Sequence, residues 1–167
     1  MPRRDARTRA PATTESRTIK GEIFRLTYKR AQRALRAGFY LESIALIESM
    51  IADRLESILA VKTRAPVPFR TVGQAAHALR GHDSLRDPAL LDDVTRWSRG
   101  RSRWMHEFAK VPDEDHLSWR ARLADARAVA EAGLGLLDRV VAESQSARRT
   151  AARRGRASQV SVPRGPD

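Results

Sequence analysis

The segment FYLESIALIESMIADRLESILAV, residues 39–61, carries the clearest structural signal in this chain of 167 residues. Apolar side chains recur in it every three or four residues, which is the period of an α-helix that buries one face. The members of this stripe are Leu41, Ile44, Ile47, Ile51, Leu55 and Ile58, and Leu46, Met50 and Leu59 widen it. A stripe this wide predicts a central helix that packs against more than one neighbour.

Weaker helical patterns lie on both sides of this segment. A partly amphipathic stretch from Ile19 ends at Gly38, because glycine readily takes the left-handed conformation that closes a helix. Beyond the central helix, two prolines in APVPF indicate a loop. Thr71 and Gln74 then have the spacing of a capping box, which predicts a short helix that ends near Gly81.

Two longer helices complete the chain. Asp87 followed by Pro88 is typical of a helix start, and the pattern continues to about Lys110. The last helix contains Gly133 and Gly135, each of which costs about 1 kcal/mol relative to alanine inside a helix. We expect a close backbone contact with a neighbouring helix to be the reason for these glycines.

These patterns predict an all-α fold, in which four long helices and one short helix form an antiparallel bundle. We expect one helical domain over residues 19–143, between a basic disordered tail at 1–18 and a basic flexible tail at 144–167. The absence of cysteine excludes disulfide scaffolds and thiolate metal sites and suits the cytoplasm. No apolar run reaches the length that spans a bilayer, so we expect no membrane partner.

The net charge of +12 is unevenly distributed along the chain. Residues 21–144 contain 20 Lys/Arg and 17 Asp/Glu, whereas the two flanks contain the other 12 Lys/Arg and only 3 Asp/Glu. Basic tails of this kind either attract nucleic acid without sequence preference or serve as solubilising, unfolded ends. The charge distribution leaves both alternatives open.

The helix expected over residues 88–110 has a charged residue in its apolar stripe. The stripe consists of Leu90, Val94, Trp97, Arg101, Trp104 and Phe108. Because burial of an unpaired charge is costly, Arg101 needs a partner or an exit to solvent. Either it forms a buried salt bridge to Asp53 or Glu48, or its stem packs on the tryptophans while its head reaches an interface.

Basic residues surround His106 on another side of the same helix. Arg99 lies almost in line with it, and Arg103 and Lys110 flank it. This side is either a solvated face with an incidental histidine or an anion site, in which several cations hold a phosphate beside a titratable imidazole.

The segment RSRWMH, residues 101–106, resembles the Arg-x4-His motif of the HEPN superfamily of small helical domains. ALRAGFYLESIALIESMIADRLESIL, residues 34–59, is similar to the long second helix of that family and the glycine-containing turn before it. The resemblance in architecture covers roughly residues 20–143. Arg99 also satisfies the looser six-residue spacing to His106 that the family allows, so either arginine fits the motif.

This resemblance implies a homodimer in which the two motifs face each other across a cleft and cleave RNA without a metal or other cofactor. His106 would be the catalytic histidine and Arg101 its partner, with phosphate bound by Arg99, Arg103 and Lys110. Ser102, Asp53 and Glu48 would support these residues as orienting groups or as structural partners. Many members of the family are toxins, each with an antitoxin, or phage-defence effectors.

The motif departs from the family pattern at two positions. Ser102 stands where asparagine is common, and Phe108 stands where some HEPN toxins have a tyrosine that is nucleotidylated. Because some HEPN domains are non-catalytic, a module that binds nucleic acid or a partner protein remains the alternative. A purely structural, oligomerising helical protein is a third possibility. Separately, His77 and His82 lie five residues apart, which is only a weak pattern for a metal site.

Overall fold

The computed structural model describes residues 14–82, 85–107 and 118–160, with the backbone alone for 14–17, 106–107 and 155–160. This part of the chain contains four long helices and one short one, which confirms the predicted all-α fold. They are α1 (Thr14–Arg36), α2 (Tyr40–Thr63), α3 (Val72–Arg80), α4 (Leu90–Glu107) and α5 (Trp119–Val160).

Two of the predicted helix signals, the stop at Gly38 and the capping box of Thr71 and Gln74, act where they are expected, whereas α4 begins at Leu90 and not at Pro88. Gly38, between α1 and α2, has a φ of 82°. Glycine takes this left-handed conformation without steric cost. At α3, the Thr71 hydroxyl accepts a hydrogen bond from Gln74 N (3.3 Å), and the Gln74 side chain accepts one from Thr71 N (3.1 Å). Together these two bonds form the capping box.

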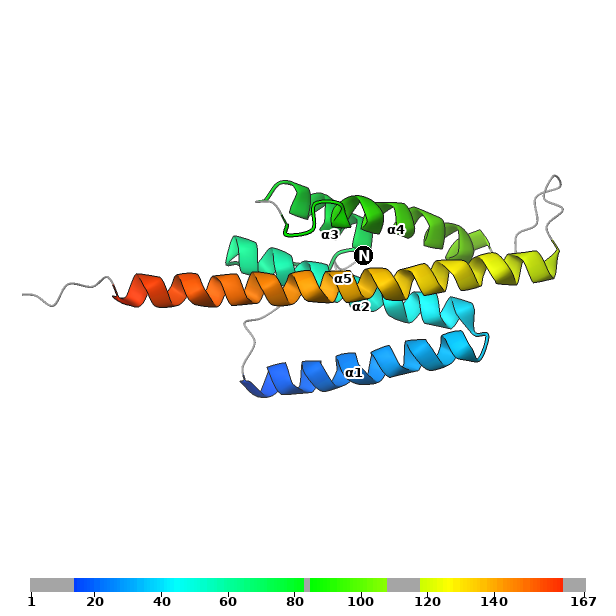
Figure 1. The fold of residues 1–167 in the computed structure, drawn as a ribbon, viewed down its shortest axis with the longest axis horizontal. Helices are drawn as coiled ribbons and strands as arrows, with labels where there is room; N and C mark the ends of the chain where they lie inside the picture. Colours follow the sequence, from blue (N-terminus) through cyan, green and yellow to red (C-terminus); the bar gives the residue numbers. More distant parts are fainter. Residues whose placement is uncertain (1–13, 83–84, 108–117, 161–167) are drawn as a thin grey trace, which may run out of the picture.

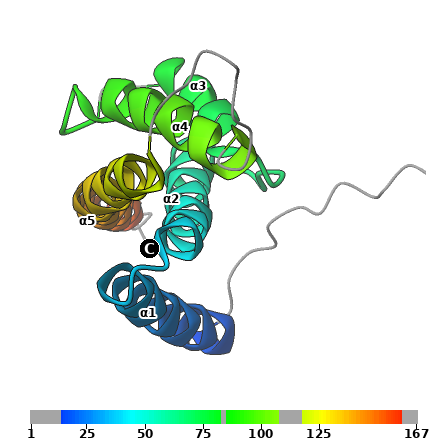
Figure 2. The same cartoon turned by 90° about the vertical axis from the view of Figure 1, so that its right-hand side faces the viewer.

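The helices pack in three layers. Figure 2 shows α2 and α5 side by side in the middle, α1 on one side of them, and α3 and α4 on the other side. Successive long helices run in opposite directions, as the prediction requires, so α2 and α5 run in the same direction (Figure 1). The contact between α2 and α5 is the largest in the fold.

The predicted stripe of α2 forms the core. Ile44, Ile47, Ile51, Leu55 and Ile58 are completely buried. Full burial of each such side chain contributes about 1.5–3 kcal/mol. The stripe is wide because α2 packs against α1, α3, α4 and α5. The width of the apolar stripe therefore predicts the central position of this helix correctly.

Trp97 of α4 packs directly against the backbone of α5. Its indole Nε1 donates a hydrogen bond of 2.9 Å to the Val129 carbonyl. A Cβ atom added to Gly133 would lie 2.8–2.9 Å from the Trp97 ring, so only glycine fits there. The expected close contact is confirmed for Gly133. At Gly135 nothing lies within 4 Å, and the structure does not explain that glycine.

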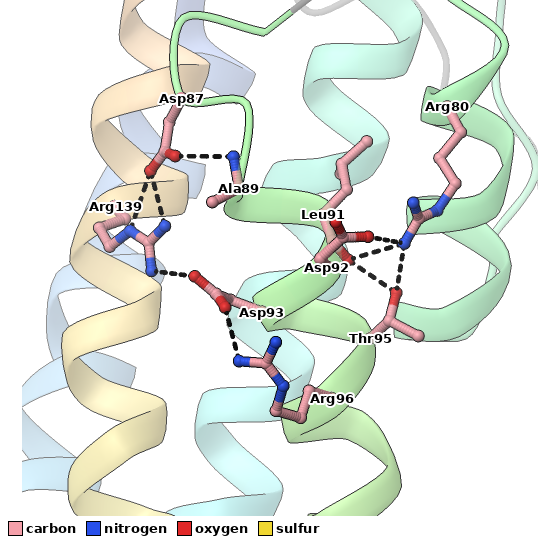
Figure 3. Close-up of polar contacts among 9 residues, drawn as sticks. All are labelled: Arg80, Asp87, Ala89, Leu91, Asp92, Asp93, Thr95, Arg96 and Arg139. Carbon is pink, nitrogen blue, oxygen red and sulfur yellow. Dashed lines mark hydrogen bonds and ion pairs between the residues drawn. The ribbon is translucent and has the colours of Figure 1, made fainter.

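The amino end of α4 is held by ion pairs, which Figure 3 shows. Arg139 of α5 donates to Asp87 Oδ2 (2.9 Å) and to Asp93 Oδ2 (2.7 Å). The hydrogen bond from Arg139 lowers the pKa of the Asp93 carboxyl below its ordinary value. Arg80 Nη2, from α3, lies 2.6 Å from Asp92 Oδ1. Carboxylates in the first turn of a helix also interact favourably with its dipole.

The final helix is longer than the sequence analysis predicts. α5 continues to Val160, through most of the segment 144–167 that we expected to be a flexible tail. Residues 144–160 contain no proline and are rich in alanine and arginine, which both favour helix. α1 likewise begins at Thr14 and not at Ile19. In the described residues, no helix is long and apolar enough to cross a membrane.

Candidate functional site at the carboxyl end of α4

The predicted apolar stripe runs along α4, and Arg101 lies within it in the carboxyl half of the helix. Trp97 and Trp104 are both buried, as the periodicity predicts, and Met105 at the edge is exposed. The Arg101 side chain is 12% exposed, and its Nη2 atom forms an ion pair with Oε1 of Glu48, which is 23% exposed. Of the two interpretations of Arg101, the structure therefore shows the salt bridge to α2.

The ion pair compensates Arg101 only in part. Arg101 Nε is buried and has no hydrogen-bond partner among the described residues. Leaving a buried donor unsatisfied costs about 1–3 kcal/mol. Among the described residues, the ion pair with the Glu48 carboxylate of α2 is what holds the Arg101 guanidinium in place, while its Nε–H stays unsatisfied.

A cationic face lies on another side of the same helix half. Arg99 and Arg103 are exposed, and Ser102 between them is half-buried. The Arg103 guanidinium lies over the Trp104 ring, 5.6 Å from its centroid, a distance that permits a cation–π interaction. The Arg103 guanidinium is thus an exposed cation beside a buried aromatic ring.

Position 106 belongs to this cationic face by helical geometry. It follows Ser102 by about one turn and Arg99 by about two turns, whereas Arg101 is about 140° away around the helix. His106 lies in the last turn of α4, and its side chain is outside the described part. Lys110 and Phe108 lie outside the described residues.

Asp53 lies further along α2 than Glu48. It is half-buried, and its carboxylate is 3.7 Å from Arg54 Nε. Arg54 in turn lies over the Phe24 ring of α1 at 4.0 Å from the centroid. The contact of Arg54 with Phe24 links α2 to α1, and Glu48 is the acid that pairs with Arg101.

His77 and His82 belong to no metal-ligating group of three residues in the described part of the chain. His77 is exposed on α3, and His82 is exposed just after it. No group of three residues with metal-ligating side chains occurs in 14–82, 85–107 and 118–160. The region around His116 lies outside these ranges.

Gly100 is a feature of the exposed face that the sequence analysis did not single out. It lies in the interior of α4, it is exposed, and nothing within 4 Å would meet an added Cβ atom. A glycine in a helix interior costs about 1 kcal/mol relative to alanine. No contact within the described chain compensates this cost. The sequence signal that could have drawn attention to Gly100 is a glycine in the interior of a predicted helix.

Comparison of the chain with protein-family models, with curated proteins and with solved structures gives no match. The architecture of the described residues, a domain of five helices, is thus established by the structure alone.

Proposed function

We propose that the protein is a metal-independent endoribonuclease of the HEPN type, with its active site at the carboxyl end of α4. The observation that carries this proposal is the exposed cationic face of Arg99 and Arg103, on which the backbone also places position 106. Cations beside a histidine are the groups that RNA cleavage through the 2′-hydroxyl needs.

The chemistry assigns a role to each residue. The His106 imidazole acts as a general base and removes the proton from a ribose 2′-hydroxyl. O2′ then attacks the adjacent phosphorus, the P–O5′ bond breaks and O5′ takes up a proton. The products are a 2′,3′-cyclic phosphate and a 5′-hydroxyl. Arg99, Arg103 and Lys110 hold the phosphate oxygens as negative charge develops on them.

The ion pair with Glu48 favours a positioning role for Arg101. The Arg101 side chain is 12% exposed and its guanidinium is bound to a carboxylate, so it has little remaining capacity for a substrate phosphate. Glu48 and Arg101 together fix the rotation of α4 against α2, and this rotation sets which face of α4 is exposed. Arg99 is then the motif arginine that contacts RNA.

We further propose that two copies of the chain associate through the exposed face of α4. A second helix packed against Gly100 would explain a glycine that no contact within the described chain explains. Small residues allow two helix backbones to approach closely. Such a homodimer brings two cationic faces together, which suits a polyanionic substrate. A role as a toxin with an antitoxin, or as a phage-defence effector, would follow from this activity.

The experiment is cleavage of end-labelled RNA in EDTA, with detection of cyclic-phosphate ends. We expect His106→Ala to abolish cleavage without loss of helicity or dimerisation, and Arg99→Gln to slow it by about 100-fold. Arg96→Gln is the matched control, because it removes the same charge one turn earlier, where Arg96 is paired with Asp93 (3.0 Å). Retained cleavage in His106→Ala would exclude the catalytic assignment.

A second candidate is a non-catalytic module that binds RNA or a partner protein on the same face. The observation in its favour is that Arg101 is already occupied by Glu48. Binding of RNA by the wild-type protein, without cyclic-phosphate products, would select this candidate.

A further inference from the structure

The carboxyl end of α5 extends beyond the helices on which α5 packs. Figure 1 shows that it projects past the ends of α1 and α2. Residues 144–160 contain five arginines and no acidic residue. Residues 144–160, which the sequence alone predicts to be a flexible tail, thus form a straight helical segment that we call the arginine rod.

The base of this rod is fixed to the bundle. Ser144 is buried, and Ala147 packs against the core. Arg148 Nη2 donates a hydrogen bond of 2.7 Å to the Ser57 hydroxyl of α2. From Arg149 to Arg154 every residue is exposed. The direction in which the exposed arginines extend is thus set by packing on α2.

Arg149 and Arg153 lie four residues apart, on the same face of α5, about 6 Å apart along its axis. Like charges at this spacing destabilise a helix by a few tenths of a kcal/mol. Earlier in α5, an acid lies four residues after an arginine: Arg127 Nε is 2.8 Å from Glu131 Oε1. For Arg149 and Arg153 the sequence provides no acid within four residues on either side. A polyanionic partner would supply the missing negative charge.

We propose that residues 148–154 of α5 form a binding site for the phosphate backbone of nucleic acid, without preference for base sequence. Arginine is well suited to this partner because its planar guanidinium donates two parallel hydrogen bonds to one phosphate. An anionic membrane fits less well, because an interfacial helix needs large apolar side chains. Residues 144–154 are only serine, glutamine, alanine, threonine and arginine.

This site is separate from the proposed nuclease site. α5 has 42 residues and is therefore about 60 Å long. The carboxyl end of α4 lies toward the amino end of α5, away from the arginine rod (Figure 1). The inference holds whether or not the chain cleaves RNA, and together the two sites would let the rod hold a long nucleic acid in place.

The test compares two double variants of the full chain, Arg149→Gln/Arg153→Gln and the control Arg33→Gln/Arg36→Gln. Arg33 and Arg36 are exposed on α1, so both variants lose two positive charges from an exposed helix. Fluorescence anisotropy is measured over a salt titration with labelled single-stranded RNA and with DNA of the same sequence. To separate binding from cleavage, the substitutions are made in the His106→Ala background.

We expect Arg149→Gln/Arg153→Gln to weaken binding of both probes by about tenfold, and the slope of log K against log salt to become shallower by about 0.7–0.9 for each lost contact. The control keeps the affinity and slope of the parent protein. Equal affinities of the two variants would overturn the proposal. So would binding to phosphatidylserine vesicles that the α5 substitutions abolish while RNA binding stays unchanged. Circular dichroism checks that α5 stays helical in each variant.

Discussion

The two halves of α4 are stabilised in different ways. In the amino half, Asp87 just before the helix and Asp93 within it are bound by Arg139 of α5. In the described part of the carboxyl half, Arg101 pairs with Glu48, and Arg99 and Arg103 are exposed. Acids and bases are matched in the first half, whereas cations predominate in the second. The difference indicates that the amino half holds the fold and that the carboxyl half is available to an anion.

Trp97→Ala should have the largest effect on stability, because it removes the main anchor of α4 on α5. The substitution leaves a cavity above Gly133 and removes the hydrogen bond to Val129. We expect the free energy of unfolding to fall by about 3–5 kcal/mol, measured by urea denaturation. A loss as small as that of an exposed substitution such as Arg99→Gln would show that the two halves of α4 do not differ in this way.

Gly133→Ala and Gly135→Ala sharpen the same comparison within α5. A methyl group at Gly133 would overlap the Trp97 ring, so we expect a net loss of about 1–2 kcal/mol after the gain in helix propensity. At Gly135 the space is open, and alanine should stabilise the protein by up to about 1 kcal/mol. Thermal unfolding of the two variants is the measurement. Stabilisation by both substitutions would mean that Trp97 does not pack on α5 as described.

A double-mutant cycle on Glu48 and Arg101 measures the coupling energy of the ion pair in the carboxyl half. Because the pair is partly exposed, we expect a coupling energy of about 1 kcal/mol from Glu48→Gln, Arg101→Gln and the double variant. If Arg101 only positions α4, the double variant should recover part of the RNA cleavage that each single variant loses. No recovery would indicate that Arg101 itself contacts RNA.

The smallest expected effect is a pH dependence in the amino half. The folded-state pKa of Asp93 is lowered by its hydrogen bond to Arg139, so the stabilisation is complete above the ordinary carboxyl pKa. It is lost as the pH falls through the lowered value, below about pH 4. In Asp93→Asn, the urea midpoint should therefore fall less than that of the wild type between pH 5 and pH 3. Parallel curves would contradict the pKa shift.

Much of this fold could be predicted from local patterns. The stripe from Ile44 to Ile58 identified the central helix, and Thr71 with Gln74 identified the start of α3. These signals work because the periodicity of a helix and the bonds of its first turn depend on residues that are close in the sequence. The predicted length of α5 was wrong because the composition of residues 144–160 fits both a tail and a helix. Arginine and serine suggested a tail, although alanine and arginine are both compatible with helix.

The candidate site could be predicted only in part. That Arg101 needed an acid followed from its place in an apolar stripe, but the choice of Glu48 depends on how α4 lies across α2. The contacts of Arg139 with Asp87 and Asp93 join residues 52 and 46 positions apart, which no local pattern reveals. The proposed roles of His106, Arg99 and Lys110 stay predictions.

The most direct test of the nuclease proposal is the chemistry of the substrate. The wild-type protein is incubated in EDTA with an RNA oligonucleotide and with the same sequence carrying 2′-O-methyl groups, and the products are identified by mass spectrometry. If His106 acts through the 2′-hydroxyl, only the unmodified RNA is cut, and each cut leaves a 2′,3′-cyclic phosphate. Cleavage of the methylated strand, or cuts that leave no cyclic phosphate, would contradict the proposal.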